Sequence, residues 1–318
     1  MNVTKDFMLD RLAETTVDDM PVIFIPSWKR PKFELSRRIL PSFNKAALER
    51  VFVVVRDEQL CEYKRENKNL QFIPIPNGKV TGLGSTRNFI LRHAIGKRLP
   101  FIMDIDDDIT SVCFLFNRKV GGKYASAMNK VEEREKDPQL YQRIFQLLGK
   151  ITREIFERHP SAVLGNFRRV HMSHNVHYAQ TKYQLNSGPT PRQTKIINMR
   201  MVEKYKLVIP DTFDIHGEDI GFAAEVLQHG FSCFNIPCIC YDFVDAAINS
   251  VVRDPKNPNS AENRALHKGE YDALQKMDVR HYLRESFKFP DGQYMFGDVD
   301  WRKYHKLYGT KPFHWRWS

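Results

Sequence analysis

Residues 101–108 read Phe-Ile-Met-Asp-Ile-Asp-Asp-Asp, so an apolar run ends abruptly in carboxylates. The aspartates repel one another, and such a cluster is stabilised when a hard cation with oxygen ligands neutralises it. The apolar lead-in predicts a strand, and ligands of open α/β sheets bind beyond the carboxyl ends of strands. The sequence therefore predicts a divalent metal at the tip of a central strand. The alternative interpretation is a solvated acidic turn.

A second acidic pair, Glu218 and Asp219, stands between glycines in the run His216-Gly217-Glu218-Asp219-Ile220-Gly221. The apolar residues that follow predict a helix, which Gly230 ends. The helix dipole stabilises acids at such a start, and this is a complete structural explanation. A carboxylate in this position is also well placed to act as a general base.

The third signal is the run Gly82-Leu83-Gly84-Ser85-Thr86-Arg87-Asn88, in which Ser85 or Thr86 is the predicted N-cap of a helix. Backbone amides at a helix start can hold an anion, and Arg87 can reach a phosphate. The segment matches neither the P-loop nor the GxGxxG dinucleotide fingerprint. It therefore indicates an anion site without identifying the anion.

The elements that must position these residues alternate along the chain. Short apolar runs predict strands at 22–25, 51–55, 72–75, 101–103, 162–164, 194–199 and 234–241. Helical spacing predicts helices at 34–40, 87–96, 137–159 and 220–229, with Pro138 at the first helical position of the third. Strands that alternate with helices at this spacing predict an α/β fold with a parallel sheet.

Composition narrows the class of protein. The 318 residues are 42% hydrophobic, enough for a substantial core, and no apolar stretch approaches the ~20 residues of a membrane span. We expect no signal peptide, and five cysteines without a CxxC pair predict reduced thiols in a cytoplasm, the host cytoplasm if the protein is viral. The net charge of +11 favours a polyanionic partner such as nucleic acid, although many soluble proteins are basic.

The order of the motifs resembles that of the GT-A family of nucleotide-sugar glycosyltransferases. A Pro-Ser-x-x-Arg segment, an acid after the second strand, an Arg-Asn helix start, a DxD and a Glu-Asp pair follow one another over about residues 20–245. The resemblance implies a GT-A (Rossmann-like) fold. We expect a mixed, mostly parallel central sheet flanked by helices, with an irregular C-terminal tail.

The resemblance assigns nucleotide-sugar binding mainly to the first half of the chain. The residues that match are Pro26, Ser27, Arg30, Asp57, Gly84, Arg87, Asn88 and Asp104. Asp106, with Asp104, would bind Mn²⁺ or Mg²⁺, while Asp106 and Asp108 form an overlapping frame. Such an ion stabilises the charge that develops on the departing diphosphate.

The same resemblance makes Asp219 the base that takes the proton from the acceptor hydroxyl, with Glu218 positioning the acceptor. Direct attack of this kind inverts the anomeric centre, and a retaining route stays open. Near the C-terminus, His305 and Lys311 loosely match a tail in which a histidine completes the metal shell and a lysine contacts phosphate. Rival histidines are His267 and His314.

These assignments divide the chain. We expect an N-terminal arm (1–20), a GT-A domain (21–245) and a C-terminal lid or tail (246–318). Within the GT-A domain, residues 21–110 would bind the nucleotide and residues 111–245 the acceptor.

A compact and basic GT-A protein resembles the phage-type glycosyltransferases that modify hydroxymethylated pyrimidines in DNA. This resemblance implies a UDP-sugar donor and the 5-hydroxymethyl group of cytosine or uracil as acceptor, reached by base flipping or from the major groove. Double-stranded DNA would be held through its phosphates. The candidate nucleic-acid-binding residues are Arg168, Arg169, Arg192, Lys195 and Arg200.

Other functions stay open at this stage. One is a glycosyltransferase that acts on a cell-envelope glycan or protein. Another is a catalytically silent GT-A-like module that binds nucleic acid only. A nucleotidyltransferase lacks support, because the N-terminal part of the chain has no GxGTR-type loop.

Overall fold

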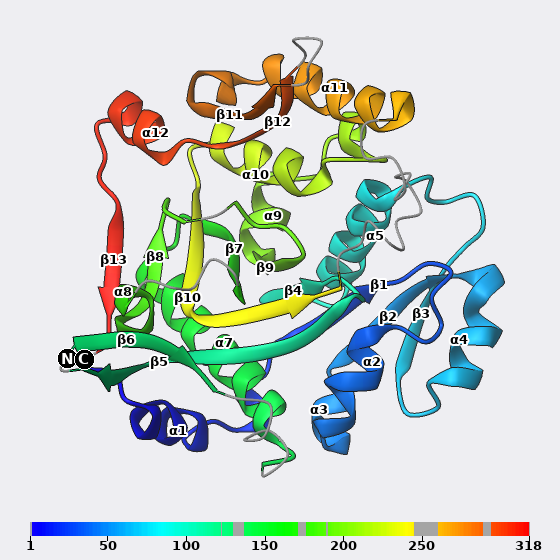
Figure 1. Ribbon diagram of the computed structural model, residues 1–318. Helices are drawn as coiled ribbons and strands as arrows, with labels where there is room; N and C mark the ends of the chain where they lie inside the picture. The colour runs from blue at the N-terminus through cyan, green and yellow to red at the C-terminus, as the bar shows by residue number, and fades with distance from the viewer. Residues whose placement is uncertain are drawn as a thin grey trace.

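The computed structural model describes residues 2–121, 123–129, 137–170, 176–188, 190–244, 260–288 and 294–317. Among them, one large mixed sheet has the strand order β13-β8-β10-β7-β9-β4-β1-β2-β3, and β5 and β6 extend it from β10. Helices cover both faces of this sheet (Figure 1). The sheet therefore supplies the frame on which every candidate site residue is placed.

The first half of the sheet is wholly parallel. Its strands are β1 (Val22–Pro26), β2 (Val51–Arg56), β3 (Gln71–Ile75) and β4 (Phe101–Ile105). The helices that connect them are α2 (Glu34–Arg38), α3 (Lys45–Leu48), α4 (Leu60–Glu66) and α5 (Leu83–Gly96). Because the carboxyl ends of parallel strands meet at one edge, Ser27, Asp57 and Asp106 follow their strands at the same edge.

The second half is mixed. Its strands are β9 (Thr194–Asn198), β7 (Ala162–Arg169), β10 (Ser232–Phe243), β8 (Thr181–Leu185), β13 (Phe313–Arg316), β5 (Ile109–Val120) and β6 (Lys123–Met128). β9 is antiparallel to β4 and β7, which restores the direction of β4 in β7 and in its parallel neighbour β10. The predicted fold class, a mixed and mostly parallel sheet flanked by helices, is confirmed.

The remaining helices complete two layers. They are α1 (Lys5–Ala13), α7 (Leu140–Arg158), α8 (Val176–Gln180), α9 (Met199–Tyr205), α10 (Glu218–Gln228), α11 (Ala261–Gln275) and α12 (Trp301–Tyr308). α1 and α7 cover one face of the sheet, and α5, α9 and α10 cover the other. α11, α12 and the hairpin of β11 (Leu283–Lys288) and β12 (Tyr294–Val299) lie outside α10 (Figure 1).

Alternating strand residues fill the two cores. Ile23 and Ile25 of β1 belong to the core under α7, whereas Phe24 between them belongs to the core under α5 and α10. Successive side chains of a strand point to opposite faces, so a strand buried on both sides reads as a continuous apolar run. This is why the short runs in the sequence located the strands correctly.

Element boundaries differ from the sequence predictions in informative places. α5 begins at Leu83, earlier than predicted, and α7 begins at Leu140, later than predicted. Asp104 lies inside β4 and not at its end, since the strand continues to Ile105. The C-terminal segment is more regular than expected, because β13 pairs with β8 and places Trp315 against Tyr183. Only tertiary pairing could define such a short edge strand.

A glycine in the middle of α7 provides a test of this packing. A Cβ atom on Gly149 would lie 1.9 Å from the carbonyl oxygen of Asp19, so Gly149→Ala is expected to destabilise the protein by about 1–3 kcal/mol. The control is Gly269→Ala in α11, where a Cβ would meet no atom within 4 Å and helix propensity favours alanine by about 1 kcal/mol. Thermal unfolding should show opposite shifts in Tm. Equal shifts in the same direction would contradict the packing of α7.

Candidate active site

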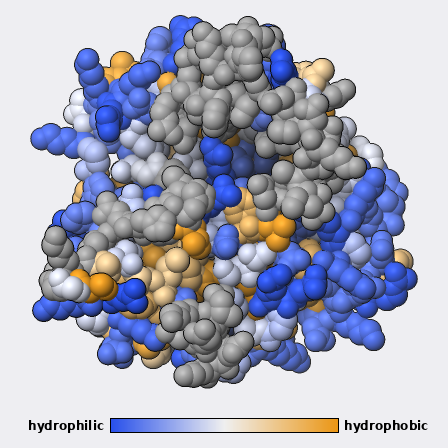
Figure 2. Space-filling model, viewed as in Figure 1, coloured by the Kyte–Doolittle hydropathy of each residue, from blue (hydrophilic) through white to orange (hydrophobic). Residues whose placement is uncertain are grey.

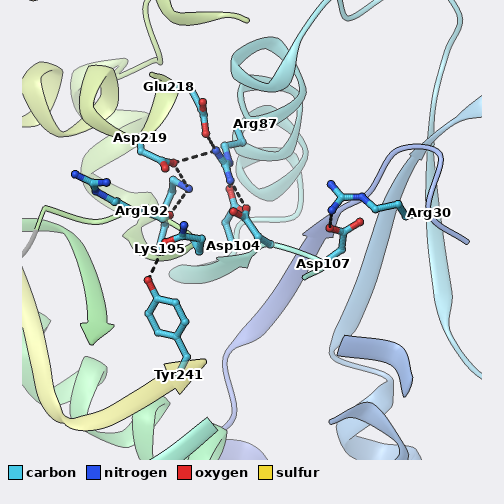
Figure 3. Close-up of polar contacts among 11 residues, drawn as sticks. Arg30, Arg87, Asp104, Asp107, Arg192, Lys195, Glu218, Asp219 and Tyr241 are labelled. Carbon is cyan, nitrogen blue, oxygen red and sulfur yellow. Dashed lines mark hydrogen bonds and ion pairs between the residues drawn. The ribbon is translucent and has the colours of Figure 1, made fainter. Parts of the chain in front are cut away.

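Arg87 is the centre of the site. Its side chain is 2% exposed and reaches from α5 to acids on β4, on the segment after β4 and at the start of α10 (Figure 3). Nε lies 3.1 Å from Asp104 Oδ2, and one terminal nitrogen lies 2.5 Å from Asp106 Oδ1. The other terminal nitrogen contacts Glu218 and lies 3.0 Å from Asp219 Oδ1. One buried guanidinium therefore joins both acidic motifs of the sequence.

A second cation, Lys195, completes this cluster. In the sheet register Lys195 of β9 stands opposite Asp104 of β4. Its Nζ lies 2.5 Å from Asp219 Oδ1 and donates to the carbonyl oxygen of Arg192 at 2.6 Å. The cluster thus contains four carboxyl groups and two basic side chains. When all six groups are ionised, the cluster has a net charge of −2, and one divalent cation would balance it.

The backbone around β4 holds the acids in place. The amide of Asp106 donates to the carbonyl oxygen of Gln193 at 2.9 Å, and the Gln193 side chain accepts from the Tyr241 hydroxyl at 2.9 Å. Tyr241 belongs to β10, so three strands meet beside the acids. The acid segment is therefore anchored at the sheet edge and is not a solvated turn.

Asp107 forms a separate polar network with the end of β1. Asp107 Oδ2 accepts a hydrogen bond from Ser27 Oγ at 2.5 Å, and Asp107 Oδ1 forms an ion pair with a terminal nitrogen of Arg30 at 3.1 Å. The Tyr63 hydroxyl lies 2.7 Å from Ser27 Oγ and accepts from the Arg30 amide at 2.9 Å. The predicted residues Ser27 and Arg30 are therefore brought to the acid run through Asp107, a residue that the sequence analysis left without a role.

The chemistry of the acid run fits a cation. Burial raises the pKa of the Asp106 carboxyl to about 6, against the opposing charges of Arg87 and Lys195. Burial, reinforced by the charges of Asp106 and Asp107, raises the pKa of Asp108 to about 8. Asp104 Oδ1 and Asp108 Oδ1 are buried and accept no hydrogen bond from any residue that the structure describes. Buried carboxylate oxygens of this kind are the ligands that Mg²⁺ and Mn²⁺ prefer.

The two acids at the start of α10 differ in charge state. Burial and the neighbouring charge of Asp219 raise the pKa of Glu218 to about 8. Burial also opposes ionisation of Asp219, but Lys195 and Arg87 outweigh it and hold its pKa below the usual range. The Asp219 side chain is 24% exposed and that of Glu218 8%. Asp219 is therefore the ionised and more accessible member of the pair.

The start of α5 already holds an anion of the protein itself. The Asp214 carboxylate accepts from the Ser85 amide at 2.5 Å and from the Thr81 hydroxyl, and the Asp214 carbonyl accepts from the Gly84 amide at 2.8 Å. Burial works against ionisation of Asp214, but these hydrogen bonds lower its pKa. A Cβ on Gly84 would lie 2.8 Å from Asp214 Cα, so glycine is needed for this close approach. The amides predicted to hold a ligand phosphate are therefore engaged by Asp214.

A pocket of about 460 Å³ opens beside the acid run. Its lining includes Arg30, Phe33, Asp107 and Asp108, with Lys32 and Glu66 at its side. Figure 2 shows hydrophilic side chains in a hollow near the middle of the displayed face of the molecule. The volume lies within the range of ligand pockets, about 300–1,000 Å³.

Other predicted donor-site residues have mixed placements. Pro26 is buried at the end of β1, and Asp57 is exposed directly after β2, at the same edge as the acids. The Asn88 side chain instead forms hydrogen bonds of 2.8 and 2.9 Å with the carbonyl and amide of Ile209. Its placement indicates a structural clamp between α5 and the segment before α10.

The C-terminal candidates lie elsewhere. His305 Nε2 is 2.9 Å from the carbonyl oxygen of Asn186, whose amide bonds Cys233 at the beginning of β10. Tyr241, near the acids, is eight residues further along β10, which corresponds to about 25 Å of strand. Exposed Lys311 follows α12 at the same far end. The structure therefore does not bring His305 or Lys311 to Asp106.

The candidate nucleic-acid-binding residues do not form one surface. Lys195 is 1% exposed and belongs to the acid cluster. Arg168 is buried with its guanidinium 3.8 Å from the Tyr178 ring centroid, and Arg169 lies 3.8 Å from that of Phe243. Arg200 is exposed at the start of α9, beside the amino end of β4. Only Arg169 and Arg192 are partly exposed near the site.

Sequence reasoning missed four contributors to the site. Asp214 lacked a signal, because its role depends on Gly82 and Gly84 lying against it from another element. Gln193 and Tyr241 also lacked a sequence signal, because they meet only when β9 and β10 both pair with β7. Asp107 did carry a signal, its place in the acid run, but its partner Ser27 is 80 residues away.

The fold and the site define an α/β protein with a buried acid cluster at the carboxyl ends of its parallel strands. The model of the TET-Associated Glycosyltransferase family matches residues 21–234, and the chain belongs to this family. The prediction that the chain belongs to a family of glycosyltransferases is thereby confirmed. A comparison with curated protein sequences found no match. Among the described residues, no helix has the length and apolar character needed to cross a membrane.

Solved structures similar to this chain include two enzymes that were determined with a nucleotide or a nucleotide sugar and a metal ion. Glucosyl-3-phosphoglycerate synthase from Mycobacterium tuberculosis, with Mg²⁺ and UDP, is 9% identical over 94% of each chain, with a TM-score of 0.45. The mannosyltransferase of Pyrobaculum calidifontis, with GDP-mannose and Mn²⁺, is 10% identical with a TM-score of 0.40. That match covers 73% of this chain, which spans 61% of the mannosyltransferase chain.

Removal of the central guanidinium tests the cluster. Arg87→Met keeps the side chain long but leaves four carboxyl groups without their shared cation, so it is expected to lower stability by about 3–5 kcal/mol in chelator. Arg92→Met, on the exposed side of the same helix, is the control and should change stability by less than about 0.5 kcal/mol. Adding Glu218→Gln to Arg87→Met should recover part of the loss. Denaturant unfolding gives the values, and equal stability of the two single variants would contradict the buried network.

Proposed function

We propose that this protein transfers a sugar from a nucleotide-sugar donor, a UDP-sugar, to a hydroxyl group on double-stranded DNA. The acceptor is the 5-hydroxymethyl group of a modified pyrimidine, and the anomeric centre is inverted. The observation that carries the proposal is the Arg87 cluster, which places the acids after β4 beside the acids of α10. In such a reaction the residues that bind the donor and the catalytic base that activates the acceptor must lie next to each other.

The donor would lie along the carboxyl edge of β1, β2 and β4. The pocket lined by Arg30, Asp107 and Asp108 has room for a nucleoside, and Arg30 supplies a cation close to it. Asp106, with Asp104 and Asp108, would hold Mn²⁺ or Mg²⁺, an assignment supported by the buried oxygens of Asp104 and Asp108 that accept no hydrogen bond from the described residues and by the raised pKa of Asp106. When bound, such an ion stabilises the negative charge of the diphosphate leaving group.

Asp219 would be the catalytic base. As the acceptor oxygen bonds to the anomeric carbon, the bond from that carbon to the diphosphate breaks, and the hydroxyl proton moves to Asp219 Oδ. Its ionised state and its exposure support this role, whereas protonated Glu218 would orient the acceptor through a hydrogen bond. Lys195 and Arg87 would keep the Asp219 carboxylate in position.

DNA would approach from the side of Arg169 and Arg192. Both are partly exposed and lie near the acids, so they are the candidates for phosphate contacts. The net charge of +11 supports a polyanionic acceptor. We place the reaction in a reducing cytoplasm, the host's if the protein is viral, because the five cysteines form no disulfide among the described residues.

The acceptor can be tested directly. The protein with Mn²⁺ and a panel of nucleotide sugars should add a hexose or pentose mass to 5-hydroxymethylpyrimidine nucleosides of duplex DNA and none to unmodified DNA. Mass spectrometry of the digested nucleosides gives the answer, with envelope glycans and protein acceptors as parallel samples. Donor hydrolysis without any DNA product would contradict the proposal that DNA is the acceptor and would indicate a glycosyltransferase that uses another acceptor.

Single substitutions separate the proposed roles. Asp219→Asn should retain UDP-sugar binding within about threefold but lower the transfer rate by 10²–10⁴-fold, because general base catalysis contributes that much. Asp106→Asn should instead abolish Mn²⁺-dependent donor binding. Isothermal titration and initial rates distinguish the two outcomes. Wild-type turnover by Asp219→Asn would refute its role as base.

A further inference from the structure

A second cluster of metal-ligand type lies on the outer side of α10. His216 precedes the first turn of α10, and His267 and Glu270 stand three residues apart on α11. We propose that these three side chains bind a transition-metal ion of the Zn²⁺ type, which clamps α11 to the start of α10. This site is separate in residues and chemistry from the acid run after β4, and it does not depend on the proposed transfer reaction.

The distances between the ligand atoms fit one small ion. His216 Nε2 lies 3.2 Å from His267 Nδ1 and 3.1 Å from Glu270 Oε2, and His267 Nδ1 lies 3.9 Å from the same oxygen. Tetrahedral zinc with bonds of about 2.0–2.1 Å holds its ligand atoms about 3.3 Å apart. Two of the three distances match this spacing and the third is somewhat longer, so the three atoms lie close enough together to share one tetrahedral ion, with the fourth position left for water.

The burial of Glu270 supplies an independent argument. Its side chain is 1% exposed, and among the described residues its charged partners are His216 and His267, whose ring nitrogens lie 3.1 and 3.9 Å from Oε2. A buried carboxylate needs a compensating charge, since leaving water costs it several kcal/mol. The two facing imidazole nitrogens lie 3.2 Å apart, and a hydrogen bond between two neutral imidazoles uses one proton at this contact. A cation satisfies both nitrogens and the carboxylate together.

The backbone of α10 is adapted to this approach. Gly217, between His216 and Glu218, has φ +77°, and a Cβ atom there would lie 2.7 Å from Glu270 Cγ. Glycine is therefore required both by the backbone conformation and by the carboxylate of the opposite helix. The close contact brings Glu270 within reach of His216 at the point where α10 begins.

The donor set selects a different ion from the acid run. Two imidazole nitrogens and one carboxylate suit Zn²⁺ and similar transition metals, whereas all-carboxylate sites suit Mg²⁺ and Mn²⁺. Since α10 begins with Glu218 and Asp219, an ion held by His216 would couple the placement of α11 to those two acids. The competing explanation is a plain ion pair between protonated His216 and Glu270, with no metal.

Metal binding can be measured on the full-length protein without any substrate. Protein stripped with chelator should take up one equivalent of Zn²⁺, measured by elemental analysis after desalting, and its Tm should rise. Co²⁺ in the same site should give the intense visible absorption of tetrahedral cobalt. Glu270→Gln and His267→Gln should each weaken Zn²⁺ binding by at least about 100-fold, because even the loss of groups outside the ligand set costs 10–100-fold.

Two control variants keep the test specific. His229→Gln removes an exposed imidazole at the other end of α10 and should bind Zn²⁺ as the wild type does. Asp106→Asn removes the proposed Mn²⁺ ligand and should also leave Zn²⁺ uptake unchanged. Failure of the wild type to bind Zn²⁺, or equal binding by Glu270→Gln, would overturn the proposal and favour the plain ion pair. Neither result would bear on sugar transfer.

Discussion

The buried guanidinium of Arg87 is the interaction on which the rest of the site depends. A charge removed from water must be compensated within hydrogen-bond distance, and here the compensation comes from carboxyl groups on two separate segments, the end of β4 and the start of α10. Because each ion pair fixes a direction as well as a distance, α5, the end of β4 and the start of α10 cannot shift independently. The need to balance the charge of Arg87 therefore fixes the relative positions of these three elements.

The charges of the Arg87 cluster are not fully balanced by its own residues. Arg87 and Lys195 neutralise only part of the acid charge, and burial raises the pKa values of Asp106 and Glu218 to about 6 and about 8. A divalent cation beside Asp106 would complete the neutralisation in the reaction that we propose. On α11, outside α10, Glu270 is another buried acid, and its partners are the imidazoles of His216 and His267. The same electrostatic rule therefore accounts for both candidate ion sites.

Much of the framework could be predicted from local sequence. Apolar runs marked β1, β2, β4 and β10, because strands buried on both faces have no polar alternation to obscure them. The acidic motifs marked the region where β4 ends and the start of α10, although Asp104 lies inside β4 and is buried there against Arg87. β13 was not predicted, because a short edge strand exists only through its pairing with β8.

The sequence by itself determined the fold class, the family of enzymes and the two acidic motifs, since these depend on residue type and on order along the chain. Tertiary structure alone decided which groups meet. It buried Lys195 against Asp219, used Asp214 to fill the anion position at α5, and held His305 at the far end of β10. The reason is physical: a charged side chain in the interior is defined by its partners, and those partners are far away in sequence.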